Sequence, residues 1–193
     1  MKLLTKNRTL GVRTFNLPAR FTCPGSSLWC EHNCYACKGK FTIPSVAYAQ
    51  QARLERTLDL AAFVDDMVAE CSGLARVRVH SSGDFYSLDY LRAWQDIAAM
   101  CPDTVFFGYT RCWVIDQAWR DELARSPSNL IILWSCDPTM PDPREYGATA
   151  ISWIASDPKA PRPNCPKQLT HGRSNCSTCG VCTLERSVSL NRH

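Results

Sequence analysis

The sequence has no long apolar run, no internal repeat and no low-complexity tract. No window approaches the roughly 18 apolar residues of a membrane-spanning helix, so we expect no membrane partner. The opening segment, MKLLTKNRTLGVRTFNL, turns polar after two leucines and lacks the apolar centre of a secretory signal peptide. We therefore expect the chain to work in the cytoplasm.

The chain also carries little net charge. Its formal charge is +4 over 193 residues, and 21% of the residues are charged against 45% that are hydrophobic. This balance excludes a disordered chain and does not require an anionic partner. The sparse basic segments LARVRVH and PRPNCPKQ are typical of solvated surface, and we do not expect a nucleic-acid groove.

Apolar periodicity predicts strands that alternate with helices, which is typical of a parallel sheet with right-handed crossovers. A complete eight-stranded barrel takes roughly 250 residues. We therefore expect an α/β fold, either a truncated parallel (β/α) barrel or an open sheet of about five strands. The predicted strands are 12–17, 76–80, 104–110, 129–135 and 148–155, and the predicted helices are 45–57, 60–71, 88–101 and 115–125.

The chain divides into two predicted regions. Residues 1–156 form the α/β domain, which includes a cysteine-rich loop at 23–37, and residues 157–193 form a cysteine-rich tail packed on the same domain. Seven of the 12 prolines lie between positions 137 and 166, so we expect that stretch to be mostly extended.

Cysteine is the abundant residue, with 12 copies. Disulfides are disfavoured in a reducing cytoplasm, so many cysteines there indicate metal ligands. Four of them fit ordinary packing. Cys71 and Cys101 lie on the apolar stripes of predicted helices, and Cys112 and Cys136 follow predicted strands. We expect these four to be buried in the core.

The other eight cysteines form two groups. In the tail, three are each separated by two residues and a remote one precedes a proline. Zinc usually takes two separate pairs, whereas this run is closer to ferredoxin-type ligation of a [4Fe-4S] cluster, because successive turns of one loop reach different corners of a cube. We favour iron–sulfur over zinc, with a metal-free tail as the third alternative. The loop cysteines are Cys23, Cys30, Cys34 and Cys37, and the tail cysteines are Cys165, Cys176, Cys179 and Cys182.

The spacing Cys30-x3-Cys34-x2-Cys37 resembles the cluster loop of the radical S-adenosylmethionine superfamily, although Ala36 stands where that superfamily usually has an aromatic residue. The resemblance implies that three thiolates hold a [4Fe-4S] cluster whose open iron binds the amino and carboxylate groups of S-adenosylmethionine. Whether Cys23 or Cys37 is the third ligand is left open. The superfamily also has an acidic motif after its second strand, which corresponds here to HSSGDF and implies ligand contacts from Ser82 and Asp84.

Five segments occur in a distinctive order: LGVRTFNLPA, TCPGSSLWCEHNCYA, VRVHSSGDFYSLDYLRAWQDIA, FFGYTRCW and NCPKQ…CSTCGVC. They run from Leu10 to Cys182 and are similar to those of the gene-product-eighty-eight-like family of phage proteins. The resemblance implies a phage-encoded iron–sulfur protein in the cytoplasm of a bacterial host cell. The family's name does not supply a reaction.

An amino-acid ligand on an open iron needs an anion for its ammonium group and a cation for its carboxylate. Asp84 and Arg111 follow two successive predicted strands and so reach the same sheet edge as the cysteine loop. We predict that they bind a small molecule of this kind, with His80 or Tyr109 transferring a proton. The alternatives are a helix cap for Asp84, an ion pair for Arg111 and a structural hydrogen bond for His80.

These features favour an iron–sulfur enzyme, and non-redox sulfur chemistry on a thiol such as cysteine, with release of sulfide, is the form we favour. The alternatives are a radical S-adenosylmethionine enzyme, an electron-transfer protein served by a host electron donor, and a zinc-stabilised module that binds RNA or a host protein. The sequence leaves open the substrate, the oligomeric state, and whether the two cysteine groups form one cluster or two.

Overall fold

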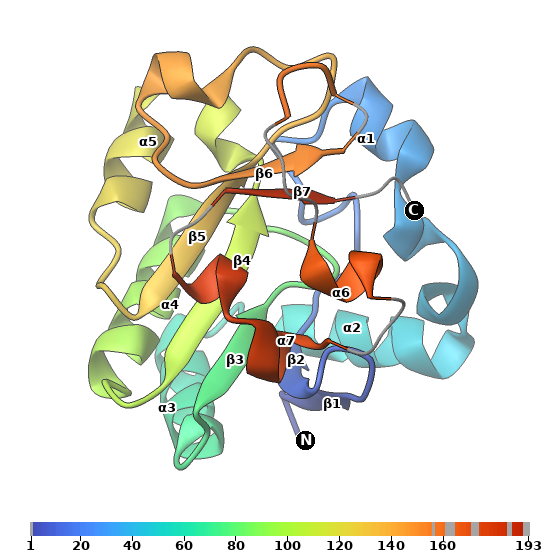
Figure 1. The fold of residues 1–193 in the computed structure, drawn as a ribbon. Helices are drawn as coiled ribbons and strands as arrows, with labels where there is room; N and C mark the ends of the chain where they lie inside the picture. Colours follow the sequence, from blue (N-terminus) through green and yellow to red (C-terminus); the bar gives the residue numbers. More distant parts are fainter. Residues whose placement is uncertain (1, 156, 161–164, 171–173, 185–186, 191–193) are drawn as a thin grey trace.

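The computed structural model describes residues 2–155, 157–160, 165–170, 174–184 and 187–190. Within these residues, one open sheet of seven strands follows the order of the sequence (Figure 1). β1 runs antiparallel to β2, and every other neighbouring pair is parallel. The strands are β1 (Thr5–Asn7), β2 (Val12–Phe15), β3 (Arg76–Val79), β4 (Val105–Thr110), β5 (Leu130–Ser135), β6 (Ile151–Ile154) and β7 (Val188–Leu190).

This topology confirms the α/β class and the open sheet, and it corrects the expected number of strands. The five predicted strands correspond to β2 through β6, and β1 and β7 add one strand at each edge. The truncated barrel is not confirmed, because β1 and β7 lie at opposite edges of the sheet and do not pair. The predicted boundaries extend at most three residues beyond the strands.

The four predicted helices are present as α2 to α5. Ser87 caps α4 as expected, since its hydroxyl accepts a hydrogen bond from the backbone of Tyr90. The α-helices are α1 (Leu28–Asn33), α2 (Pro44–Arg56), α3 (Leu60–Cys71), α4 (Leu88–Met100), α5 (Gln117–Ala124), α6 (Pro166–Leu169) and α7 (Cys176–Cys179); the 3-10 turns are η1 (Tyr35–Cys37), η2 (Gly39–Thr42), η3 (Cys112–Val114), η4 (Pro143–Tyr146) and η5 (Val181–Thr183).

The two faces of the sheet have different covers. Helices α3, α4 and α5 pack on one face, as expected when successive parallel strands are joined by crossovers of one hand (Figure 1). An aromatic core lies beneath them and includes Phe15, Phe63, Tyr90 and Trp94, all fully buried. Cys71, Cys101, Cys112 and Cys136 are buried in this same core, which confirms that they are packing residues.

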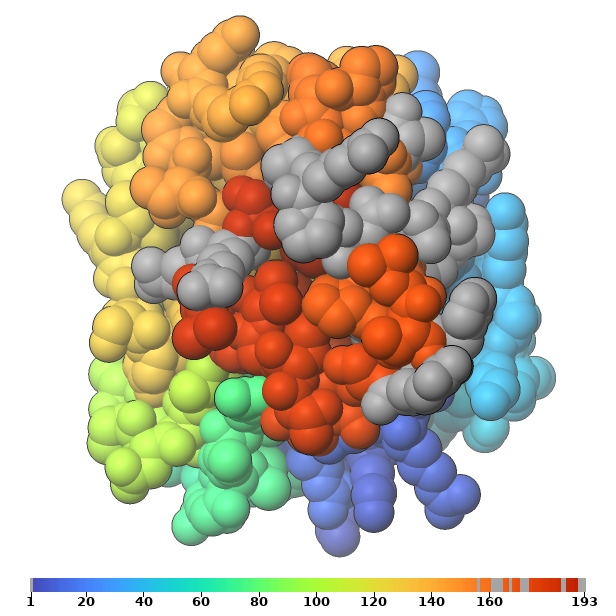
Figure 2. All heavy atoms as spheres, viewed as in Figure 1, coloured from blue at the N-terminus to red at the C-terminus, as the bar shows by residue number. Residues whose placement is uncertain are grey.

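The cysteine-rich tail covers the opposite face, which we call the tail face. Figure 2 shows α6, α7 and η5 over the middle of that face. Along each strand, residues of the aromatic core, which we call the helix-side core, alternate with residues that face the tail. The residues that pack against the tail include Val12, Phe107, Ile131 and Leu133. The tail therefore supplies the second hydrophobic layer of the fold.

Residues 137–166 are expected to be mostly extended, and this expectation is wrong where η4 forms a 3-10 turn. The tail forms α6, α7 and η5, and its β7 lies parallel to β6, with the Ala155 amide donating to the Leu190 carbonyl at 2.7 Å. The predicted features at 156, 161–164, 171–173, 185–186 and 191–193 lie outside the described residues. In the part of the chain that the structure describes, no helix has the length and apolar character needed to cross a membrane.

Candidate metal centres

The loop cysteines lie at the edge of the sheet where the parallel strands end. Cys30 lies in α1, Cys34 follows this helix, and Cys37 ends η1. Burial, together with the neighbouring charges of Asp84, Cys30 and Cys34, raises the pKa of Cys23 to about 12. The Cys37 thiol forms a hydrogen bond with Cys34, and burial raises the pKa of Cys37 as well. The fold therefore brings all four loop cysteines together.

The segment after β3 anchors the chain just before this loop. The Ser82 hydroxyl donates to the carbonyl of Leu17 at 2.7 Å, and the Asp84 amide donates to the carbonyl of Thr22 at 3.0 Å. Between them, Gly83 has a φ of +83°, and a Cβ on it would lie 2.6 Å from the Thr22 hydroxyl oxygen. Only glycine fits this backbone and this close approach. Ser82, predicted to bind ligand, thus has a structural contact.

Asp84 lies beside the loop cysteines and is 6% exposed. One of its carboxylate oxygens accepts the Phe85 amide at 2.7 Å, and the other accepts the Arg111 amide at 2.8 Å. Burial raises its pKa to about 6, although these hydrogen bonds oppose the shift. Asp84 does not cap the following helix, because Ser87 does so. Instead it joins the ends of β3 and β4 next to Cys23 and Cys30.

The Arg111 guanidinium forms a buried ion pair with Asp137, which follows β5. Asp137 also accepts hydrogen bonds from the Ser27 hydroxyl at 2.6 Å and the Thr139 hydroxyl at 2.7 Å. Burial alone would raise the pKa of Asp137, but these hydrogen bonds and the Arg111 charge hold it below its ordinary value. Ser27 in turn accepts the Cys30 amide at 3.0 Å. Arg111 and Asp137 thereby position the loop.

A close backbone contact fixes the loop against β4. A Cβ on Gly25 would lie 2.3 Å from the Arg111 carbonyl oxygen and 2.8 Å from the Cys112 amide nitrogen. These are backbone atoms, which cannot move aside as the end of a flexible side chain can. Glycine at this position therefore lets the cysteine loop reach the strand ends.

The two residues predicted to transfer protons lie on opposite faces of the sheet. His80 is 3% exposed in the helix-side core, and its Nε2 lies 2.9 Å from the Tyr90 hydroxyl. Burial, with help from Arg78, lowers the pKa of His80 to about 3, so the ring stays neutral. Tyr109 lies on the tail face, with its hydroxyl 2.9 Å from the Cys182 sulfur. The fold does not bring these two side chains together.

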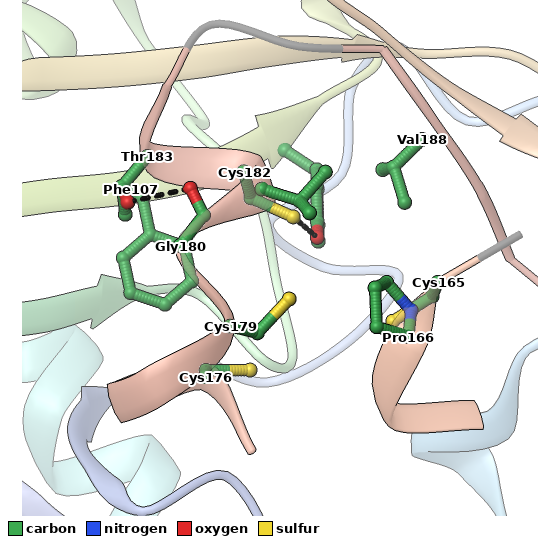
Figure 3. A pocket seen from close by; sticks show the side chains of 11 residues that line it. Phe107, Cys165, Pro166, Cys176, Cys179, Gly180, Cys182, Thr183 and Val188 are labelled. Atoms are coloured by element: carbon green, nitrogen blue, oxygen red, sulfur yellow. Dashed lines mark hydrogen bonds between the residues drawn. The ribbon is translucent and has the colours of Figure 1, made fainter. Parts of the chain in front are cut away.

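The tail cysteines surround a small cavity on the tail face (Figure 3). The sulfur atoms of all four point into the space between α6 and the α7–η5 segment. Burial, together with the nearby thiols of Cys165 and Cys176, raises the pKa of Cys182 to about 11. Apolar side chains, including those of Phe107 and Val188, complete the lining.

The arrangement of these thiols bears on the kind of metal centre they can hold. Among the described residues, no three His, Cys, Asp or Glu side chains are placed to hold a single metal ion as they stand. Zinc needs all four sulfurs at about 2.3 Å from one point, so the side chains would have to draw together. A [4Fe-4S] cube is larger and accepts more widely spaced thiolates. Four inward-facing thiols with an apolar lining are the kind of donor set that such a cluster requires.

The two cysteine groups are separate places in the fold. Cys30 and Cys34 raise the pKa of Cys23, whereas Cys165 and Cys176 raise the pKa of Cys182. The two groups thus lie at different places on the sheet, one where the parallel strands end and the other on the tail face.

Sequence reasoning missed three residues at these sites: Tyr35, whose hydroxyl donates to the Ser81 carbonyl, Arg78 and Asp137. The reading of LARVRVH as solvated surface is wrong for Arg78, which is 7% exposed. An acidic residue two positions after a buried strand is the signal for Asp137, and a charge inside a β-branched strand is the signal for Arg78.

Comparison with known proteins finds relatives by sequence, and no solved structure matches the chain. The "Gene 88 protein" of Mycobacterium phage D29 is 27% identical, over 95% of this chain and 88% of the relative. That of Mycobacterium phage L5 is 26% identical, over 93% of this chain and 87% of the relative. The family described as "Gene product 88" matches residues 2–184, and the chain belongs to this family of phage proteins.

Proposed function

We propose that this protein is an iron–sulfur enzyme whose loop cysteines hold a [4Fe-4S] cluster through three thiolates, leaving one iron open for a small molecule with an amino-acid group. The observation that carries the proposal is the gathering of Cys23, Cys30 and Cys34 beside Asp84 and Arg111 at the strand ends. Parallel α/β sheets place their ligand sites at this edge.

Asp84 and Arg111 retain capacity for a ligand beyond their contacts within the protein. A carboxylate offers about four acceptor positions, and a guanidinium has five donor hydrogens. Asp84 accepts two backbone amides and a hydrogen bond from Thr110. The contacts of Arg111 with Asp137 and the Met140 sulfur use one guanidinium nitrogen. In our proposal, Asp84 attracts the ligand's ammonium and Arg111 its carboxylate, while both keep their structural contacts.

The reaction class we favour is carbon–sulfur cleavage of a thiol such as cysteine, with release of sulfide. In this elimination the Cβ–S bond breaks as the α-proton leaves, so cysteine gives hydrogen sulfide and 2-aminoacrylate without any oxidant or reductant. A bound cluster with an open position supplies a thiophilic, Lewis-acidic iron for such chemistry. The residues of the chain bind and orient the amino-acid group. The position of His80 argues against its taking part in proton transfer, because it lies in the helix-side core and its Nε2 faces Tyr90.

The test is anaerobic preparation followed by counting of iron and acid-labile sulfide. We expect roughly eight irons per chain when both sites are filled. The cluster spectrum should then change on addition of L-cysteine or S-adenosylmethionine but not of L-serine, the matched control without sulfur. Sulfide release from cysteine alone supports the non-redox enzyme, and a response to S-adenosylmethionine alone supports the radical enzyme. Zinc without labile sulfide would overturn the proposal.

A second function, electron transfer, is favoured by one observation. Each cysteine group contains four thiols, enough to ligate a cluster completely, and the two groups lie at separate sites of one sheet. In that case, the loaded protein should exchange electrons with a host donor, and its spectrum should respond to neither cysteine nor S-adenosylmethionine.

A further inference from the structure

Arg78 is a buried cation in the middle of the sheet. It lies in β3 opposite Phe107 of β4, on the tail face, while its neighbours Val77 and Val79 belong to the helix-side core. Its Nε donates to the His80 carbonyl at 3.2 Å, and its guanidinium carbon lies 3.9 Å from the centre of the Tyr109 ring. The arginine is thus oriented toward the tail.

No carboxylate pairs with Arg78 in the described parts of the chain. A buried charge is costly without an opposite charge, and a contact with an aromatic ring offsets only part of that cost. Burial by itself lowers the pKa of Arg78, but its neighbours reverse the direction. These neighbours are the acidic groups of Tyr109, Tyr35, Cys182 and Cys176.

We propose that Arg78 is the counter-cation of a metal centre held by the four tail cysteines. Four thiolates around either zinc or a [4Fe-4S] cluster carry a net double negative charge. The Arg78 guanidinium balances part of it, because it lies against the Tyr109 ring, whose hydroxyl contacts the Cys182 sulfur. The inference needs metal at the tail site only, so it survives if the proposed chemistry at the loop cysteines fails.

This role has a consequence that a purely structural role lacks. Without metal, Arg78 is an unbalanced buried charge, and replacing it with an apolar side chain of similar length should not destabilise the protein. With metal, the same replacement removes the balancing charge and should weaken the site. The replacement should therefore not lower the stability of the metal-free protein, but it should lower that of the metal-bound protein.

The experiment compares wild type with Arg78→Met and Arg78→Lys, each as the full chain. Urea unfolding is measured without metal, under reducing conditions with chelator, and again after loading with Zn²⁺ or with Fe²⁺ and sulfide. Metal retention is measured by competition with a chelator. Arg76→Met is the matched control, because Arg76 lies on the same strand and face but donates to the carbonyls of Cys176 and Ser177 instead.

We expect Arg78→Met to be at least as stable as wild type without metal and to hold metal at least tenfold more weakly. Arg78→Lys should hold metal within about threefold of wild type, because it keeps the charge. Arg76→Met should change the stability of the protein in the same direction with and without metal. In the iron-loaded protein, Arg78→Met should lower the reduction potential.

Equal destabilisation of Arg78→Met with and without metal, or unchanged metal retention, would overturn the proposal. Should Arg78→Met fail to fold, equal loss of metal by Arg78→Lys and Arg78→Gln would overturn it.

Discussion

His80 illustrates how a single residue supports the site without touching it. It has a φ of +59°, a left-handed conformation that is uncommon for residues other than glycine. Its ring packs edge-on against Phe15, Phe85 and Trp94, and it hydrogen-bonds with Tyr90. These contacts hold the strained turn that directs Ser82 and Asp84 toward the cysteine loop.

The depressed pKa of His80 predicts that the stability of the protein depends on pH. The folded state keeps the ring neutral down to about pH 3, whereas the unfolded chain binds a proton near pH 6.5. Stability from the neutral ring is therefore present above pH 6.5 and is lost as the pH falls toward 3. The free energy of unfolding of wild type, relative to His80→Gln, should fall by roughly 1.4 kcal/mol per pH unit below about 6.5.

Urea unfolding between pH 7.5 and 5 measures this difference. Asp84 also titrates in this range, but it is present in both proteins and cancels. Tyr90→Phe is the control, since it removes the hydrogen-bonding hydroxyl and keeps the histidine, so its difference from wild type should vary little with pH. A difference between wild type and His80→Gln that stays flat over this range would contradict the assignment.

At the scale of elements, the site depends on loops that follow three parallel strands. The loop after β3 anchors residues 17–22, the end of β4 contacts Gly25, and Asp137 after β5 holds Ser27. Each contact fixes a different part of the segment that carries the loop cysteines. The strands thus align the cysteines from one side of the molecule.

Gly25→Ala tests this alignment. The added methyl group would meet the Arg111 and Cys112 backbone, so the loop should be displaced and the free energy of unfolding should fall by about 1–3 kcal/mol. The variant should also lose iron from the loop site. Gly108→Ala is the matched control, because its Cβ would lie 2.7 Å from the Val79 carbonyl oxygen, within the sheet and away from the loop. Equal iron content per folded molecule in the two variants would argue against the loop contact.

The elements that could be predicted are those with a strong period. Strands β2 to β6 and helices α2 to α5 each show an apolar pattern in the sequence, and the same pattern placed Asp84 and Arg111 at one edge. Strands β1 and β7 have three residues each, too few for a pattern. The pairing of Arg111 with Asp137 also requires the order of the strands, which the local pattern does not contain.

At the scale of the whole molecule, the sheet separates two cysteine sites. One site lies where the parallel strands end, and the other lies on the tail face. Arg78 interacts with acidic groups near both sites, Tyr35 beside the loop cysteines and Cys182 in the tail. The tail arrangement could not be read from the sequence, because Arg78 and the tail cysteines are about 90 residues or more apart in the chain. Only the folded sheet brings them together.

Two separate sites predict that single cysteine variants divide the iron between them. Cys34→Ser and Cys176→Ser should each lose about half of the iron and labile sulfide of wild type, because serine is a poor ligand for iron in a sulfide cage and each site keeps its own thiolates. Any spectral response to L-cysteine or S-adenosylmethionine should disappear in Cys34→Ser and persist in Cys176→Ser. Iron counting and spectroscopy of anaerobic protein measure both effects.

Cys71→Ser is the control for this pair. Cys71 is fully buried in the helix-side core, so a hydroxyl there should cost about 1–3 kcal/mol of unfolding free energy and leave the iron content unchanged. If Cys34→Ser and Cys176→Ser each remove all of the iron while both proteins stay folded, the two groups share one cluster. In that case, Arg78 would lie beside a single centre and the tail would provide its remaining ligands.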